Sequence, residues 1–95
     1  MYGVEWSPEA LDELAVLWVE ASPDIRRVIN TAVEQLDHDL QLDPFLQSES
    51  RGEDDERRVQ FCYPLAIRFK VNSQDRRVRV SQVRRFRRRG EPDTR

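Results

Sequence analysis

Arginine is concentrated in one stretch near the C-terminal end of this 95-residue chain. Eight of the fifteen residues in DRRVRVSQVRRFRRR, residues 75–89, are arginines, although the formal net charge of the chain is -2. A guanidinium group binds phosphate or carboxylate through two parallel hydrogen bonds and stays protonated at neutral pH. The stretch therefore predicts a surface that binds a polyanion or an acidic peptide.

The charge is divided unevenly along the chain. Residues 1–56 contain 15 acidic and 3 basic residues, a balance of -12, whereas residues 57–95 contain 13 basic and 3 acidic residues, a balance of +10. The acidic half can screen part of the basic half within one molecule. The arginines at residues 84–89 nevertheless have few acidic neighbours, so the asymmetry favours different partners for the two halves.

The segments that position these arginines begin with a short strand and two helices. Residues 2–6 (YGVEW) alternate as a strand, and Ser7-Pro8 and Ser22-Pro23 are start signals of helices. The short link between the helices predicts an antiparallel hairpin. The second helix has apolar residues at 25, 28, 29, 32, 33, 36 and 40. The first is expected to bury Leu11, Leu14, Ala15 and Trp18.

Alternation with a period of two follows the polar loop at residues 45–56. It predicts three strands whose apolar side chains share one face: Val59, Phe61 and Tyr63; Leu65, Ile67, Phe69 and Val71; Val78 and Val80. The fold class is therefore α+β in the order β-α-α-β-β-β, with the helical hairpin packed on one face of a small antiparallel sheet. We expect one domain over residues 1–89 and disorder over residues 90–95.

The residues out of phase with the core set define the opposite, open face of the sheet. Their charged groups are expected within about 10 Å of one another, because neighbouring strands lie about 4.8 Å apart. Like charges opposed across strands destabilise a sheet by a few tenths of a kcal/mol per pair, so such a surface indicates an anionic partner. The predicted binding residues are Arg58, Arg68, Lys70, Arg77 and Arg79, followed by Arg84, Arg85 and Phe86.

The composition excludes several classes of protein. No run approaches the roughly 18 apolar residues that cross a bilayer, and the first residues lack the basic and apolar regions of a secretory signal. Cys62 is the only cysteine, which excludes an internal disulfide and a cysteine-based metal site. We therefore expect a soluble cytoplasmic protein that binds no metal, cofactor or membrane.

The chain resembles the RelE/ParE family of toxins from bacterial toxin–antitoxin pairs. The resemblance covers residues 2–86. It rests on VEWSPEALDELAVLW, on the second helix with its ending LDPFLQSESRG, and on RRVQFCYPLAIRFKVNSQDRRVRVSQV. It implies a toxin that a cognate antitoxin holds inactive. Members that resemble RelE cut messenger RNA on the ribosome without a metal, whereas members that resemble ParE bind DNA gyrase.

Metal-free RNA cleavage requires a base for the 2′-hydroxyl, a proton for the leaving 5′-oxygen and cations over the phosphorane. The candidate catalytic residues are Lys70, as the base, with Arg68 and Arg79. Neighbouring cations favour a neutral amine at Lys70. The resemblance implies a tyrosine or histidine in the tail, where this chain has Phe86, and an earlier arginine at the position nearest Ala66. These departures leave the assignment as an enzyme open.

Three functions therefore remain for the basic face: a ribosome-dependent mRNA endoribonuclease, a gyrase-binding toxin without chemistry, and an inactive module that binds only its antitoxin. Phe86 either caps the core or stacks on a base. The remaining candidates have structural interpretations: His38 as a solvated helix residue, Tyr63 and Trp18 as core residues, and Cys62 as an inert thiol.

Overall fold

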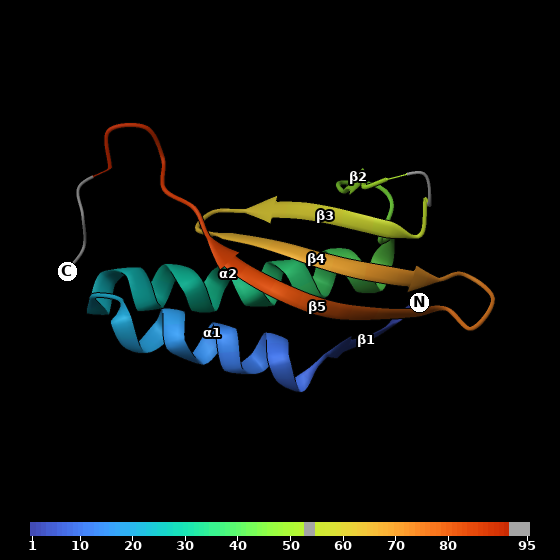
Figure 1. Ribbon diagram of the computed structural model, residues 1–95, viewed down its shortest axis with the longest axis horizontal. Coiled ribbons are helices and arrows are strands. Elements are labelled where there is room, and N and C mark those ends of the chain that lie inside the picture. The colour runs from blue at the N-terminus through green and yellow to red at the C-terminus, as the bar shows by residue number, and fades with distance from the viewer. Residues whose placement is uncertain (53–54, 92–95) are drawn as a thin grey trace.

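The computed structural model describes residues 1–52 and 55–91. Two helices cover one face of a sheet, and the other face is free of helices (Figure 1). The elements are β1 Gly3–Trp6, α1 Pro8–Glu20, α2 Pro23–Leu42, β2 Glu49–Ser50, β3 Arg57–Cys62, β4 Leu65–Asn72 and β5 Arg77–Arg85. The predicted α+β order is confirmed, with the short strand β2 added in the expected loop.

Both helices begin where the sequence predicts. The Ser7 hydroxyl oxygen accepts a hydrogen bond from the Ala10 N–H at 3.1 Å, and the Ser22 hydroxyl oxygen accepts one from the Ile25 N–H at 3.3 Å. A proline follows each serine at the start of its helix. Because N–H groups in a first helical turn have no partner within the helix, these caps define the helix starts.

The sheet is mixed, with the strand order β1-β5-β4-β3-β2. Strands β3, β4 and β5 form the predicted antiparallel meander. Strand β1 pairs with β5 in parallel, which places Glu5 opposite Arg79. The first strand of the chain thus lies beside the last, and it brings a carboxylate to the edge of the basic strands.

The core lies between α2 and the two strands β4 and β5. The predicted inward residues of β4 are buried, as are Val78 and Val80 of β5. An irregular register near Arg68 and Phe69 lets Val83 return to the core face three residues after Val80. The helix contributes Ile29, Ala32, Leu36 and Leu40 to the same core.

Strand β3 alternates in the opposite phase to the prediction. Gln60 lies opposite the core residue Ile67 and is 2% exposed, whereas Phe61 is 53% exposed on the open face. The predicted inward positions of Phe61 and Tyr63 are therefore wrong, whereas Val59 is only 4% exposed although it shares the phase of Phe61. On the helix side the amide nitrogen of Gln60 donates to the Asp39 carboxylate at 3.2 Å, whereas its amide oxygen is buried without a hydrogen-bond partner among the described residues.

Helix α1 buries less apolar surface than its sequence predicts. Ala10 is its buried residue, Leu14 and Leu17 are half-buried, and Leu11 and Trp18 are 50% and 39% exposed. The predicted buried stripe through Leu11, Leu14, Ala15 and Trp18 is therefore mostly wrong. The helix contacts β5 near one margin of the sheet, so much of the stripe faces outward.

No helix in residues 1–52 and 55–91 combines the length and apolar character that crossing a membrane requires. The sequence predicts disorder over residues 90–95, but positions 92–95 lie outside the residues that the structure describes. Gly90 and Glu91 are described, in a segment that leaves β5 on the side away from the helices (Figure 1).

Candidate nucleic-acid interface

A row of cations crosses the open face of the sheet. Arg57 on β3 lies opposite Lys70 on β4, and Lys70 lies opposite Arg79 on β5. Arg68 precedes Lys70 by two residues and therefore projects from the same face. All four side chains are exposed. Adjacent like charges repel, so this row is a surface that an anion would stabilise.

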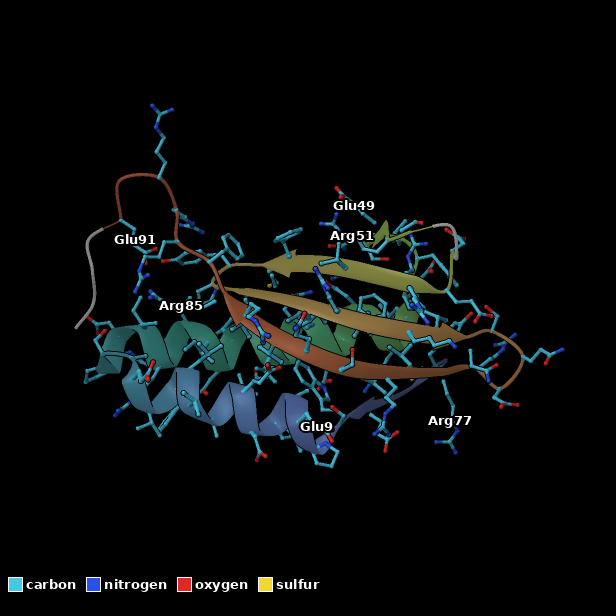
Figure 2. All side chains as sticks on the ribbon, in the orientation of Figure 1. Glu9, Glu49, Arg51, Arg77, Arg85 and Glu91 are labelled. Atoms are coloured by element: carbon cyan, nitrogen blue, oxygen red, sulfur yellow. The ribbon has the colours of Figure 1, made fainter. Side chains whose placement is uncertain are left out.

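A groove of about 580 Å³ follows this row. Its lining includes Arg51, Arg57, Arg68, Lys70 and Arg79. Arg51 comes from the loop after β2 and lies over the β3 side of the sheet (Figure 2). Sequence reasoning missed both Arg51 and Arg57. Arg57 was missed because the predicted phase of β3 was inverted. Arg51 was missed because no local pattern in the sequence places its loop beside the sheet.

The groove continues toward the end of the β3–β4 hairpin. A second hollow of about 300 Å³ shares Arg51 and Arg68 with the first, and its lining includes Phe61, Gln82 and Arg84. The continuous surface therefore combines guanidinium groups with one exposed aromatic ring. Basic grooves with an aromatic platform are typical of single-stranded nucleic-acid binding, because phosphates bind the cations and bases stack on the ring.

Part of the positive charge has partners within the chain. The Arg79 Nη1 atom lies 2.9 Å from Glu5 Oε1, and the two side chains are 54% and 60% exposed. An exposed ion pair contributes about 0–1 kcal/mol, so Arg79 can exchange Glu5 for a phosphate. Among the described residues, Arg57, Arg68 and Lys70 form no ion pair with a carboxylate. The open face therefore keeps an uncompensated cationic centre.

Arg58 does not belong to the open face, contrary to the prediction. Its side chain is 9% exposed and donates to Ser48 Oγ at 2.5 Å, the Ser48 carbonyl at 3.0 Å, the Asp55 carboxylate at 2.8 Å and the Asp55 carbonyl at 3.0 Å. Its guanidinium also lies 5.0 Å from the Phe45 ring centre. Arg58 therefore anchors the loop between α2 and β3, on the helix side of the sheet.

The remaining predicted arginines lie in different places. Arg77 is exposed at the start of β5 and projects away from Arg51 (Figure 2), in a separate hollow with Lys70. Arg84 lies opposite Ala66 on the open face. Arg85 lies opposite the buried Leu65, with a side chain only 10% exposed. Only Arg84 of these three extends the groove directly.

Phe86 packs at the end of the β3–β4 hairpin. Its ring centre lies 5.6 Å from Phe61 and 5.8 Å from Tyr63, and both contacts are edge-to-face. These contacts match the capping interpretation and leave Phe61 as the more exposed ring. Tyr63 is half-buried at this hairpin end, and its hydroxyl donates to the Glu91 carboxylate. Its predicted place in the core is therefore wrong.

Two other titratable residues match their structural interpretations. His38 is exposed on α2, as expected for a solvated residue. Cys62 packs against the core cluster, where burial raises the pKa of its thiol and the Asp39 carboxylate raises it further. A protonated thiol is a poor nucleophile, which agrees with an inert role.

A second uncovered surface is apolar and lies between the two helices. This groove of about 580 Å³ is lined by Leu11, Leu14, Ala15, Trp18, Val19, Ile29, Asn30, Val33 and Glu34. The Trp18 indole donates to the Asn30 side chain at 3.2 Å, which holds the ring at the surface. The exposed fractions of 50% at Leu11 and 65% at Val19 are typical of a protein contact surface.

Glu13 connects α1 to the end of β5. Its carboxylate accepts a hydrogen bond from the Val83 N–H at 3.0 Å and pairs with Arg84. The hydrogen bond from Val83, together with Arg84, lowers the pKa of Glu13 against the opposing effect of desolvation. Since the folded state lowers this pKa, the stabilisation is present above the ordinary value of 4.5 and is lost as the pH falls through the folded value.

We therefore expect Glu13→Gln to lower the free energy of unfolding by about 1 kcal/mol at neutral pH. The difference from the wild type should vanish at a pH well below the folded pKa of Glu13, where the wild-type carboxyl is also protonated. Urea denaturation at both pH values measures this, with Glu9→Gln on the exposed first turn of α1 as the control. An equal loss at both pH values would contradict the proposed role of the charge.

Solved structures show which fold this is. The sequence itself matches no protein-family model and no curated protein. A chain of the RelBE2 toxin–antitoxin complex of Mycobacterium tuberculosis superposes with a TM-score of 0.69 and 18% identity, over 88% of this chain and 90% of that one.

Two further structures give similar values. A chain of the chromosomal ParDE system of P. aeruginosa has a TM-score of 0.69 and 18% identity, over 92% of this chain and 98% of that one. The isolated E. coli RelE toxin has a TM-score of 0.64 and 16% identity, over 95% and 89%. The resemblance inferred from the sequence is confirmed at the level of structure, and this chain has the fold shared by RelE and ParE toxins.

Proposed function

We propose that this chain is the toxin of a toxin–antitoxin pair and acts as a metal-independent, ribosome-dependent mRNA endoribonuclease. The observation that carries the proposal is the row of Arg57, Lys70 and Arg79, with Arg68 beside it, along one groove of the open face. The fold shared with the RelE toxin supports the same function. Sheets tolerate a row of opposed cations at a cost in stability, which an RNA backbone would offset.

The proposed reaction is a transesterification at one phosphodiester. The Lys70 amine acts as the base that takes the proton of the 2′-hydroxyl, and the oxygen attacks the adjacent phosphorus. The bond from phosphorus to the 5′-oxygen breaks, and the ammonium formed on Lys70 returns the proton to that oxygen. The products are a 2′,3′-cyclic phosphate and a 5′-hydroxyl. Arg68 and Arg79 donate to the non-bridging oxygens as their negative charge increases.

The proposed inhibitor is an antitoxin with an acidic segment. Chains with this fold have been solved in the RelBE2 complex of M. tuberculosis and the RelBE complex of E. coli, both toxin–antitoxin complexes. Carboxylates and phosphates use the same guanidinium donors. An acidic segment in the groove would therefore compete with RNA for Arg57, Arg68 and Lys70.

Controlled expression in a bacterial host tests this function. Growth should stop, and protein synthesis should stop before DNA replication. Primer extension on messenger RNA from the same cells should show new 5′ ends within translated codons. Coexpression of an adjacent reading frame with an acidic C-terminal segment is the control and should restore growth. Intact messenger RNA in arrested cells would contradict the endoribonuclease function.

The apolar groove between α1 and α2 favours a second function, which is binding to DNA gyrase without chemistry. Exposed apolar side chains such as Leu11 and Val19 fit a protein partner rather than RNA. In addition, the basic groove offers few candidate bases for RNA cleavage, because Lys70 carries the only amine among the described residues that line it. Inhibition of supercoiling by purified gyrase, together with intact messenger RNA, would replace the first function with this one.

A further inference from the structure

The segment after β5 places a carboxylate among cations at the end of the β3–β4 hairpin. The Glu91 Oε2 atom lies 2.7 Å from Arg85 Nη2 and 3.9 Å from Arg87 Nε. The Oε1 atom accepts hydrogen bonds from the Tyr63 hydroxyl and, at 3.4 Å, from the Arg88 N–H. Arg85 and Glu91 lie at the same end of the molecule (Figure 2). We call the residues around this carboxylate, residues 85–88 with Tyr63, the tail clasp.

The ionised carboxylate is enclosed by the tail clasp. The side chains of Arg85 and Glu91 are only 10% and 11% exposed. The Arg88 guanidinium lies 3.9 Å from the Tyr63 ring centre. The hydrogen bond from Tyr63, followed by the Arg88 N–H and the charges of Arg85 and Arg87, lowers the pKa of Glu91, although desolvation opposes this. Glu91 is therefore a charged ligand of its own chain.

The donors around Glu91 suit a phosphodiester as well as a carboxylate. Guanidinium groups, a hydroxyl and a backbone N–H all donate to phosphate oxygens in nucleic-acid complexes. Two neighbouring features favour a nucleic acid over an acidic peptide. Phe61 offers an exposed ring 5.6 Å from Phe86, and Arg84 connects the region to the basic groove.

Glu91 can leave without disturbing the sheet. It lies beyond the end of β5 at Arg85, so its release breaks no strand pairing. Gly90, immediately before it, has a φ of +82°, a conformation that glycine adopts without strain. The same carboxylate can thus close the site or swing out of it.

We propose that the tail clasp is a phosphodiester-binding subsite that Glu91 occupies in the absence of RNA. A strand that runs along the groove past Arg84 displaces Glu91, binds Arg85, Arg87 and the Tyr63 hydroxyl, and stacks a base on Phe61. This rests on the proposed RNA-binding function and adds a competitor within the chain. Glu91 weakens RNA binding until a sufficiently long strand replaces it.

The first experiment tests the tail clasp without any ligand. The hydrogen bond to Glu91, then burial, then the charge of Glu91 raise the pKa of Tyr63. In a Tyr2→Phe background Tyr63 is the only tyrosine, so ultraviolet absorbance of its tyrosinate reports this pKa directly. Glu91→Gln should lower the pKa of Tyr63, whereas Glu34→Gln on α2 should leave it unchanged. An unchanged pKa in Glu91→Gln would overturn the tail clasp.

The second experiment measures competition with RNA. A fluorescent single-stranded oligoribonucleotide of about 12 nucleotides should bind Glu91→Gln about tenfold more tightly than the wild type. Glu34→Gln changes the net charge equally at a distant site, so it isolates the general effect of charge. Equal affinities of the two variants would overturn the subsite.

Two other outcomes separate this inference from the proposed function. If a polyglutamate peptide, but not RNA, binds Glu91→Gln more tightly than the wild type, the subsite is one for acidic peptides and the phosphodiester assignment is overturned. If neither the wild type nor Glu91→Gln binds RNA at all, the RNA-binding function is overturned together with the assignment. Normal wild-type binding without a gain in Glu91→Gln overturns the subsite alone.

Discussion

The double substitution Arg68→Ala and Lys70→Ala should lower messenger-RNA cleavage by at least about 10³-fold. It removes the proposed base and one of the cations over the phosphorane from the middle strand of the open face. Both side chains are exposed, and neither forms an ion pair within the described residues, so the fold should persist. Cleavage is measured by primer extension with translating ribosomes, and folding by thermal denaturation.

The matched control is Arg27→Ala with Arg76→Ala. It also removes two positive charges, one from α2 and one from the turn before β5, and neither lies on a strand of the open face. The control should cut messenger RNA at nearly the wild-type rate. Cleavage that survives the double substitution at residues 68 and 70 would show that the catalytic residues lie elsewhere.

Arg57 and Arg58 are neighbours in sequence, but substitution of Arg58 should reduce stability whereas substitution of Arg57 should reduce RNA binding. Arg58→Ala should lower the free energy of unfolding by about 2–3 kcal/mol, because it removes a nearly buried side chain and leaves acceptors on Ser48 and Asp55 without their donor. For a domain of this size, such a loss lowers the melting temperature by roughly 10–20 °C.

Arg57→Ala should leave stability within about 0.5 kcal/mol of the wild type or raise it slightly. Arg57 lies opposite Lys70, so its removal relieves a repulsion between like charges. It should instead weaken binding of single-stranded RNA and reduce the salt dependence of binding by about 0.7 in the log–log slope, the value for one phosphate contact.

Thermal denaturation and RNA titrations at several salt concentrations on the two variants measure both effects. The pair provides its own control, since each variant removes one arginine charge from β3. A stable Arg58→Ala variant, or an Arg57→Ala variant with unchanged salt dependence, would contradict the phase that the structure gives this strand.

Repulsion within a row of cations on a sheet opposes folding. Two ion pairs at the margins of the open face reduce this repulsion. Glu5 of β1 pairs with Arg79, and Glu13 of α1 pairs with Arg84. Both carboxylates belong to the acidic N-terminal half, so part of the expected compensation between the halves occurs within the molecule. The centre of the row, at Lys70 and Arg68, has no such partner among the described residues.

Local features of the sequence determined the elements and most of the core. The Ser-Pro pairs define the helix starts through side-chain caps, and the apolar spacing of α2 predicts its buried face. Alternation in β4 and β5 placed Arg68, Lys70 and Arg79 on the open face correctly. These predictions succeed because they depend on backbone geometry and side-chain period within a few residues of one another.

Tertiary structure alone decided which residues of β3 face the core, the exposure of Trp18 and the position of the segment after β5. A strand with polar and apolar residues at alternate positions has two possible phases. In β3 it is Gln60 that faces inward, where Asp39, 21 residues away, accepts a hydrogen bond from its amide nitrogen. Parallel pairing brings Glu5 to Arg79, and the segment after β5 brings Glu91 to Tyr63, 28 residues away. Such partners lie far apart in the sequence, and no local period encodes which of them meet.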